Sequence, residues 1–255
     1  MEKTEINRLL TCILEILEMM VESGAEIYRV DESAVRVCKA YGMERVDIYA
    51  TTSNIIISVE DGGTIKSHTR RVKQINTDIE RVHRLNELVR NMTANTPSIS
   101  EIAEEIKEIK AAPVYSAPLI FAFYGIIAGA FYLFFGGRDI TELIISTVTG
   151  VLVGVISRLL GKINANRLLG RFVCSLFACL VAFAGLRLGL AKSVDHIIIG
   201  NIMTLIPGIG LTNALRDLFA GDSISGVLRI IEAALLALAI ACGYIIAAYF
   251  LGGAA

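Results

Sequence analysis

The spacing of apolar residues predicts helices at the start of this chain. One helical face near the N-terminus carries Ile6, Leu9, Leu10, Ile13, Leu17 and Met20. The stretch SGAEIYRVDESAVRVCKAYG then predicts a second helix from about residue 25 to residue 40, which Gly42 ends. These two segments therefore read as amphipathic helices of a folded domain, and the N-terminus does not read as a signal peptide.

The pattern then changes from a helical to an alternating period. RVDIYATT, NIIISVE and GTIKSHTRR are short, β-branched segments, and Asp61-Gly62-Gly63 is a hairpin-turn signal between the last two. NTDIERVHRLNELVRNM returns to helical spacing, and SISEIAEEIKEIK opens with a Ser-x-x-Glu pattern that suits a helix N-cap. The pattern predicts a cytoplasmic α+β domain over residues 1–95 and a linker helix over residues 96–113.

From residue 114 onward the apolar runs are long enough to cross a bilayer, which takes about 20 helical residues. The predicted spans are residues 114–135, 140–160, 172–190, 194–213 and 224–251. The fold class is therefore an α-helical integral membrane protein, with about five transmembrane helices in a membrane domain of residues 114–255. Small-xxx-small spacings favour close helix packing and occur at Gly125 and Gly129, Gly150 and Gly154, and Gly185 and Gly189.

Charge separates the two parts of the chain and sets the predicted orientation. Residues 1–113 hold 15 of the 24 Lys and Arg and 19 of the 25 Asp and Glu. The second membrane loop, SRLLGKINANRLLGR, is rich in basic residues, whereas the first holds only Arg138, so the second loop is expected to be cytoplasmic. Five crossings then place the N-terminus in the cytoplasm and the C-terminus outside, although Arg187 and Lys192 in the third loop run against this rule.

Composition argues against several classes of function. Net charge near zero, without a basic patch, gives no argument for nucleic-acid binding. The five cysteines form no CxxC pair and the three histidines share no ligand spacing, so neither a metal nor a cofactor is expected. A membrane-embedded enzyme would need a nucleophile with a positioned base or a metal cluster, and neither spacing is visible.

The stretch NIMTLIPGIGLTNALRD breaks the rules for a membrane-spanning helix. Pro207 removes a backbone hydrogen bond, and freed backbone groups are tolerated only against protein or a water-filled cavity. A simple kink is the alternative interpretation. Because transporters build substrate sites at interrupted helices, the predicted substrate-binding residues are Thr204, Pro207, Gly208, Gly210, Thr212, Asn213 and Arg216.

Ionisable residues follow the interruption and form a predicted proton-coupling and charge network. This network consists of Asp217, Arg229 and Glu232, of which the last two lie three residues apart at the start of the fifth span. Ionisable groups within spans are functional candidates by default, and the alternative is that Asp217 and Arg216 are ordinary interfacial residues.

Two long motifs resemble the threonine/serine exporter family, and the similarity covers about residues 8–250. The family's GAE-x-x-R-V pattern falls on Gly24, Glu26 and Arg29, and its PG-x-x-LTNALRDL pattern begins at Pro207. The role of the first motif stays open between a surface ion pair, docking of the cytoplasmic domain and a tight turn at Gly24.

This resemblance implies secondary active, proton-coupled export of threonine, serine or similar small polar amino acids across a bacterial inner membrane. An exporter subunit for a small dicarboxylate such as succinate is the alternative. It also implies a second, smaller membrane protein of the same family as partner, contact with membrane lipid, and a possible homo-oligomer. A membrane-anchored ligand-sensing or scaffold protein is the remaining alternative, which polar residues inside the spans argue against.

Overall fold

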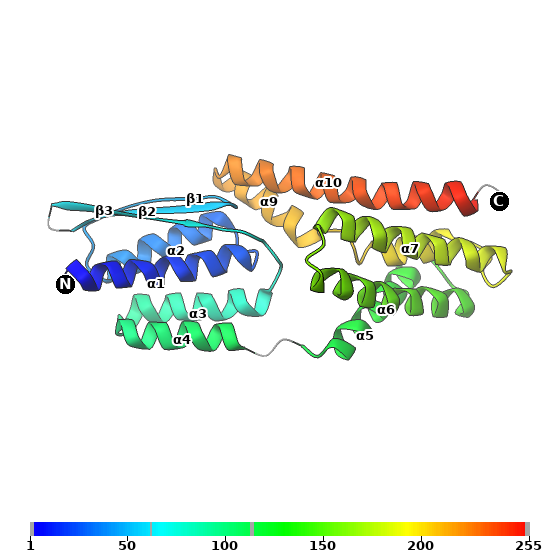
Figure 1. Cartoon of the computed structure of the whole chain (residues 1–255), viewed down its shortest axis with the longest axis horizontal. Helices are drawn as coiled ribbons and strands as arrows, with labels where there is room; N and C mark the ends of the chain where they lie inside the picture. Colours follow the sequence, from blue (N-terminus) through cyan, green and yellow to red (C-terminus); the bar gives the residue numbers. More distant parts are fainter. Residues whose placement is uncertain (1–2, 62, 113–114, 253–255) are drawn as a thin grey trace. The chain divides into compact units, whose positions relative to one another are not determined.

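The computed structural model describes residues 3–61, 63–112 and 115–252 (Figure 1). The chain forms two compact units. The first contains residues 1–113 and 208–231, and the second contains residues 114–207 and 232–255. Helix α10 (Ser223–Ala247) contributes residues to both units.

A three-stranded antiparallel sheet of order β1-β2-β3 lies in the first unit. Its strands are β1 (Arg45–Ala50), β2 (Asn54–Asp61) and β3 (Thr64–Arg71), which confirms the three predicted strand segments. On β2 the residues Ile55, Ile57 and Val59 are buried and alternate with more exposed neighbours, as expected for a sheet with one covered face. Asp61 pairs with Thr64 across the predicted hairpin, whose Gly62 lies outside the described residues.

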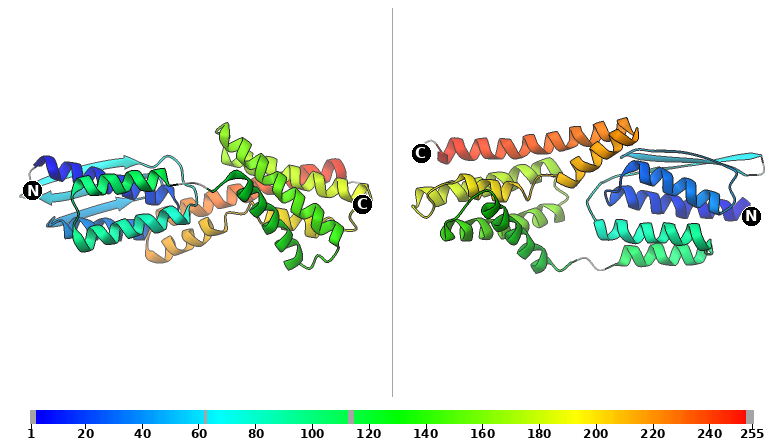
Figure 2. Two further views of the ribbon diagram at one scale, coloured as in Figure 1. Left: turned by 90° about the horizontal axis from the view of Figure 1, so that it is seen from below. Right: turned by 180° about the vertical axis from the view of Figure 1, so that it is seen from behind.

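Four helices of the first unit lie on one side of this sheet (Figures 1 and 2). They are α1 (Lys3–Glu22), α2 (Ile27–Ala40), α3 (Ile79–Asn95) and α4 (Ile99–Ala111). Helices α1 and α2 pack against the strands, and α3 and α4 form the next layer. The apolar face predicted for α1 is buried, with Leu9, Leu10 and Met20 fully enclosed.

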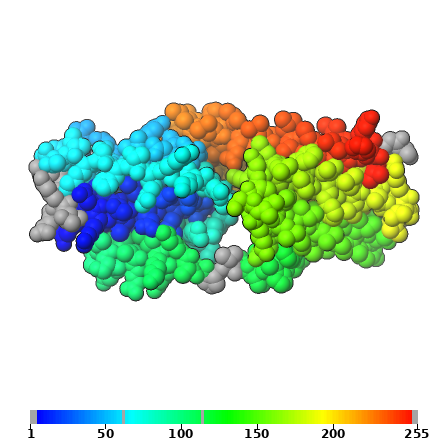
Figure 3. Space-filling view, viewed as in Figure 1, coloured from blue at the N-terminus to red at the C-terminus, as the bar shows by residue number. Residues whose placement is uncertain are grey.

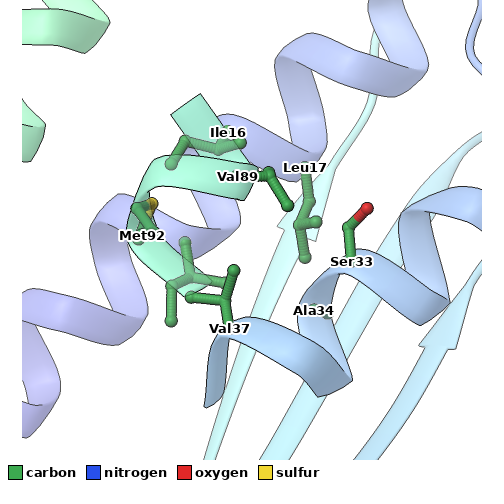
Figure 4. A pocket seen from close by; sticks show the side chains of 8 residues that line it. Ile16, Leu17, Ser33, Ala34, Val37, Val89 and Met92 are labelled. Atoms are coloured by element: carbon green, nitrogen blue, oxygen red, sulfur yellow. The ribbon is translucent and has the colours of Figure 1, made fainter. Parts of the chain in front are cut away.

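The side chains between α1, α2 and α3 form the centre of this core (Figure 4). The space between them is lined by Ile13, Ile16, Leu17, Ser33, Ala34, Val37, Val89 and Met92. It is too narrow to admit a water molecule, and its lining is apolar apart from Ser33. We therefore interpret it as core packing and not as a ligand site.

Helix α4 begins at the predicted cap. The Ser98 hydroxyl accepts from the Glu101 amide, and the Glu101 carboxylate accepts from the Ser98 amide, which is a capping box. Ile102, Ile106 and Ile109 are buried in the core that α1–α3 share. The range predicted as a linker thus contains a helix that packs onto the rest of the first unit.

The second unit is helical in its described residues. It comprises α5 (Ala117–Phe134), α6 (Ile140–Lys162), α7 (Arg167–Arg187), α8 (Asp195–Ile202), the rest of α10 and a π-helical turn, η1 (Ala248–Gly252). Four helical stretches of the described residues are long and apolar enough to cross a membrane. These are Ala117–Phe134, Ile140–Lys162, Arg167–Arg187 and Ser223–Leu251.

The remaining predicted span, residues 194–213, is divided between two short helices. Helix α8 ends at Ile202, and α9 (Gly208–Ala220) begins after the Met203–Pro207 interruption. Neither helix reaches the length of a span, so five crossings stay a prediction. The break itself is present, as the position of Pro207 predicts, because proline has no N–H to continue the helical ladder.

Small residues allow α5 and α6 to approach closely. A Cβ added at Gly150 would lie 2.6 Å from the Ala128 Cβ and 2.7 Å from the Tyr124 carbonyl oxygen. One added at Gly125 would lie 2.9 Å from the Thr147 carbonyl oxygen. The spacings predicted on these two helices are therefore at their contact. At Gly185 the nearest atoms are 3.6 Å away, which is ordinary packing.

Candidate functional site

The two sequence motifs meet in the first unit, 190 residues apart along the chain. One contributes the turn and first residue of α2, Gly24–Ile27, and the other contributes side chains of α9 and early α10. We call this contact the motif latch, consisting of Gly24, Ala25, Glu26, Ile27, Asn213, Arg216, Asp217 and Arg229. No local signal in the sequence indicates this pairing, because the two motifs lie far apart along the chain.

The turn before α2 depends on Gly24. Its φ of +88° is in the left-handed region, and an added Cβ would lie 2.9 Å from the Asn76 carbonyl oxygen. Glycine therefore suits this position for two reasons, conformation and space. The turn leaves the carbonyl oxygens of Gly24 and Ala25 and the amide of Ile27 available to partners from α9 and α10.

Three hydrogen bonds use those backbone groups. The Asn213 side-chain nitrogen donates to the Gly24 carbonyl oxygen at 2.8 Å, and an Arg229 guanidinium nitrogen donates to the Ala25 carbonyl oxygen at 2.8 Å. The Ile27 amide donates to Asp217 Oδ1 at 2.9 Å. Asp217 thus accepts at the N-terminus of α2, where the helix dipole favours a negative charge.

Asp217 and Arg229 also form a buried ion pair. Arg229 Nε lies 3.5 Å from Asp217 Oδ2, and the two side chains are 6% and 0% exposed. Burial raises the pKa of Asp217, while Arg229 and the Ile27 amide oppose that rise. A pair this deeply buried is costly to break from one side, because the remaining charge loses its compensation.

Glu26 completes the latch as an acceptor for two arginines. Arg216 Nη1 lies 2.6 Å from Glu26 Oε1, and Arg29 Nε lies 2.8 Å from Glu26 Oε2. The Glu26 side chain is 10% exposed, whereas both arginines are more than half exposed. The latch therefore has a buried centre and a solvent-accessible basic edge.

A second carboxylate lies near the latch on α2. Burial and the negative charge of Asp222 raise the pKa of Asp31 to about 7, and a hydrogen bond from the Ala50 backbone opposes this shift. Its Oδ1 atom is buried and accepts no hydrogen bond from the described residues. This part of the first unit is therefore expected to titrate near neutral pH.

A separate polar cluster lies in the second unit beside the α8 interruption. The Asn201 side-chain nitrogen donates to the Ile197 carbonyl oxygen at 2.9 Å and is 3.3 Å from both the backbone and the hydroxyl oxygen of Ser146. Ser146 in turn donates to the Ala128 carbonyl oxygen. Asn201 and Ser146 are both fully buried, so three helices share one network.

The side-chain oxygen of Asn201 has no hydrogen-bond partner among the residues that the structure describes. Exchanging the amide oxygen and nitrogen would place the oxygen against two carbonyl oxygens, so the assigned orientation is the favourable one. A buried, unsatisfied acceptor costs about 1–3 kcal/mol. This oxygen therefore marks a place where a bound donor would be stabilising.

Glu142 anchors a third cluster, at the start of α6. Its carboxylate accepts from the Tyr132 hydroxyl at 3.0 Å and from the amides of Lys192 and Ser193 at 2.8 and 3.0 Å. Glu142 is only 4% exposed, although a charged residue at the start of a span could face water. Three donors converge on it and replace the lost hydration.

The structure distributes the predicted substrate-binding residues over both units. Thr204 and Pro207 belong to the second unit, and Gly208, Gly210, Thr212, Asn213 and Arg216 belong to the first. The Thr204 and Thr212 hydroxyls donate to backbone carbonyls of Asn201 and Gly208. Within the motif latch, Asn213 donates to the Gly24 carbonyl oxygen and Arg216 donates to the Glu26 carboxylate. Their polar groups are therefore engaged within the protein.

The predicted charge network is divided in the same way. Asp217 and Arg229 pair in the latch of the first unit, whereas Glu232 in the second unit lies 2.5 Å from Arg167 Nη1. Asn201, Ser146 and Glu142 were not among the predicted site residues. The sequence signal for Asn201 and Ser146 is a polar side chain within a long apolar run.

The four candidate spans and the three-stranded sheet define a mostly helical membrane protein with a smaller α+β part. The family model described as "Putative threonine/serine exporter" matches residues 11–251. The chain therefore belongs to the threonine/serine exporter family.

Three relatives are similar over nearly the whole chain. A "Probable threonine/serine exporter" of Mycobacterium tuberculosis is 24% identical over 94% of this chain and 46% of its own length. The "Threonine/serine exporter" of Corynebacterium glutamicum is 23% identical over 95% of this chain and 51% of its own length. The "Probable succinate transporter subunit YjjP" of Klebsiella aerogenes is 22% identical over 96% of this chain and 95% of its own length.

The chain thus spans about half the length of the first two relatives and nearly all of the third. No solved structure matches it.

Proposed function

We propose that this chain is one subunit of a secondary active exporter for small polar amino acids such as threonine and serine. The subunit lies in a bacterial inner membrane with its N-terminal domain in the cytoplasm, and export is coupled to protons. Membership of the exporter family supports the class of solute, and the basic second loop supports the orientation.

The unsatisfied Asn201 oxygen beside the helix break is the observation that carries the choice of solute. An amide oxygen accepts hydrogen bonds, and the ammonium and hydroxyl groups of serine and threonine donate them. An ionised dicarboxylate has no donor and would leave this acceptor unsatisfied. The geometry therefore favours an amino acid over succinate, which is the alternative suggested by the Klebsiella relative.

Within the second unit, Thr204 and Pro207 accompany Asn201 in the proposed substrate site. The Asn201 carbonyl accepts from the Thr204 hydroxyl at 2.7 Å, which links the two residues across the end of α8. The break that ends at Pro207 frees backbone groups of the kind that transporters present to solutes. For proton exchange we retain Glu232, whose carboxylate faces Arg167 in the second unit.

A second membrane protein is part of this proposal. Two relatives named as exporters are about twice as long as the matched segment, whereas a relative named as a subunit matches along almost its whole length. By analogy with the relative named as a subunit, this chain is proposed to work with a second, smaller membrane protein of the same family.

The test measures efflux of serine, threonine and succinate from loaded cells that express Asn201→Leu at the parent protein level. Loss of amino-acid efflux is expected, because the variant removes the acceptor at similar volume. Asn86→Leu is the matched control, since it is the same substitution on α3 and the Asn86 side chain donates to the Val82 carbonyl oxygen of its own helix. Unchanged serine efflux in Asn201→Leu would remove this site, and efflux of succinate alone by the parent would favour the dicarboxylate alternative.

A further inference from the structure

The hairpin formed by α9 and the first nine residues of α10 has an inverted distribution of polarity. In α9 the buried residues include Asn213 and Asp217, and in early α10 they include Ser225 and Arg229. The exposed large apolar residues of the same hairpin are Ile209, Leu211, Leu215, Phe219, Ile224, Val227, Leu228 and Ile231. A helix that meets water does the opposite and exposes its polar residues.

The polar side of the hairpin has its partner in the motif latch, whereas the apolar side has none among the described residues. Phe219 is 90% exposed, and the seven other side chains are between 42% and 60% exposed. In α9, Leu211, Leu215 and Phe219 recur every four residues and therefore share one helical face. Residues 208–231, in orange, lie at the surface of the molecule (Figure 3).

Continuity along α10 indicates what covers this face. Ile224, Leu228 and Ile231 lie on the same helix as the exposed Leu235 and Leu238, and all five belong to the candidate span Ser223–Leu251. A 29-residue span is about 43 Å long at 1.5 Å per residue. The hydrocarbon core is about 30 Å thick and the whole bilayer about 40–45 Å. The excess over the hydrocarbon core equals about nine residues, which is the length of Ser223–Ile231 in the first unit.

Helix α9 cannot be a crossing of its own. Its 13 residues span about 20 Å, well short of the hydrocarbon core. At the edge of the hairpin, Arg216 and Arg29 are 57% and 51% exposed and share a single carboxylate, Glu26. A short amphipathic helix with phenylalanine and leucine on one face and arginine beside it is the composition of helices that lie in the lipid interface.

We propose that the α9–α10 hairpin inserts its apolar face into the headgroup and upper acyl region of the bilayer. The motif latch then attaches the soluble domain to a lipid-embedded element. This inference depends on membership of a membrane-transporter family and not on the identity of the solute. The ligand is phospholipid, with the phosphate groups beside Arg216 and Arg29 and the acyl chains against Phe219 and Leu215.

The sequence contains no tryptophan, so a single Phe219→Trp substitution gives an unambiguous fluorescent reporter in the full-length chain. The protein is reconstituted in phosphatidylcholine vesicles that carry bromine either near the headgroup end or near the tail end of the acyl chains. We expect blue-shifted emission, quenching of about twofold by shallow bromine, weaker quenching by deep bromine, and little quenching by acrylamide in the water.

Two reference positions calibrate the measurement. Ile65→Trp on β3, where the residue is 71% exposed, reports water and is expected to respond to acrylamide alone. Leu152→Trp in the candidate span α6, where the residue is 41% exposed, reports the deep acyl region. Circular dichroism of each variant confirms that the helices are retained.

Each other outcome at position 219 overturns the proposal. Acrylamide quenching without a bromine effect places the hairpin in water. Blue-shifted emission that neither quencher affects places it against protein. Because no transport is measured, a failed efflux experiment leaves this result intact, and a failed quenching experiment leaves the proposed solute unaffected.

Discussion

Single residues in this protein carry charge where solvent does not reach. Asp217 is fully buried, yet it accepts from the Ile27 amide and faces the buried Arg229. Glu142 is similarly enclosed and accepts from three donors. In both places the surrounding donors compensate for the lost hydration, so each carboxylate has a structural role in its own unit.

The buried pair leads to a stability prediction. Asp217→Asn keeps a side-chain acceptor for the Ile27 amide but leaves the Arg229 charge without its carboxylate, so we expect a loss of about 3–5 kcal/mol. Denaturant unfolding of the purified chain measures it. Glu87→Gln is the control, because the Glu87–Arg90 pair is exposed and exposed pairs contribute little. If Asp217→Asn is no less stable than this control, the latch does not depend on charge compensation.

Asp31 gives a pH dependence with a definite sign. Its pKa is about 7 in the folded chain against an ordinary value of 3.8, so between these values the folded state holds the proton more tightly. Stability from this group is therefore highest at acidic pH and falls as the pH rises toward 7. Asp31→Asn, which mimics the protonated form, is expected to melt at a higher temperature than the parent at about pH 8 and similarly at about pH 4.

Melting curves of both proteins across that range test this expectation. Asp47→Asn, on the exposed side of β1, serves as the control for removal of one negative charge. A parallel shift of Asp31→Asn at every pH would contradict the assigned titration.

Elements differ in how far the sequence predicts them. The three strands and the capping box of α4 were predicted because their signals are local: alternation, a glycine turn and a Ser-x-x-Glu spacing. The interruption at Pro207 was predictable for the same reason. The latch and the Asn201 network were not, because each joins residues from helices far apart in the chain, and a hydrogen bond across 190 positions has no local pattern.

The contact between α5 and α6 gives an element-scale prediction. Gly150→Leu would force a side chain against the Ala128 Cβ and the Tyr124 backbone. We therefore expect the free energy of unfolding to fall by about 1–3 kcal/mol. Gly161→Leu on the same helix is the control, because a Cβ there meets no atom within 4 Å. Thermal unfolding in detergent compares the two variants, and equal melting temperatures would show that the close approach is unimportant for stability.

For the whole molecule, the proposed partner leads to a transport prediction. We expect the purified chain alone to show no serine counterflow in proteoliposomes, and co-purified chain and partner to show it, because a relative that this chain matches along almost its whole length is named as a subunit. Asn201→Leu with the partner is the inactive control. Full counterflow by the single chain would contradict the two-component proposal.

The separation of the two motifs also has a consequence for biosynthesis. The Gly24–Ile27 turn leaves the ribosome long before Asn213, Asp217 and Arg229 are made, since about 190 residues lie between them. The core of α1–α4 can therefore form early, but its turn stays without these partners until α9 and α10 emerge. Completion of the latch therefore waits for the synthesis of α9 and the start of α10, which follow the soluble-looking first helices by about 190 residues.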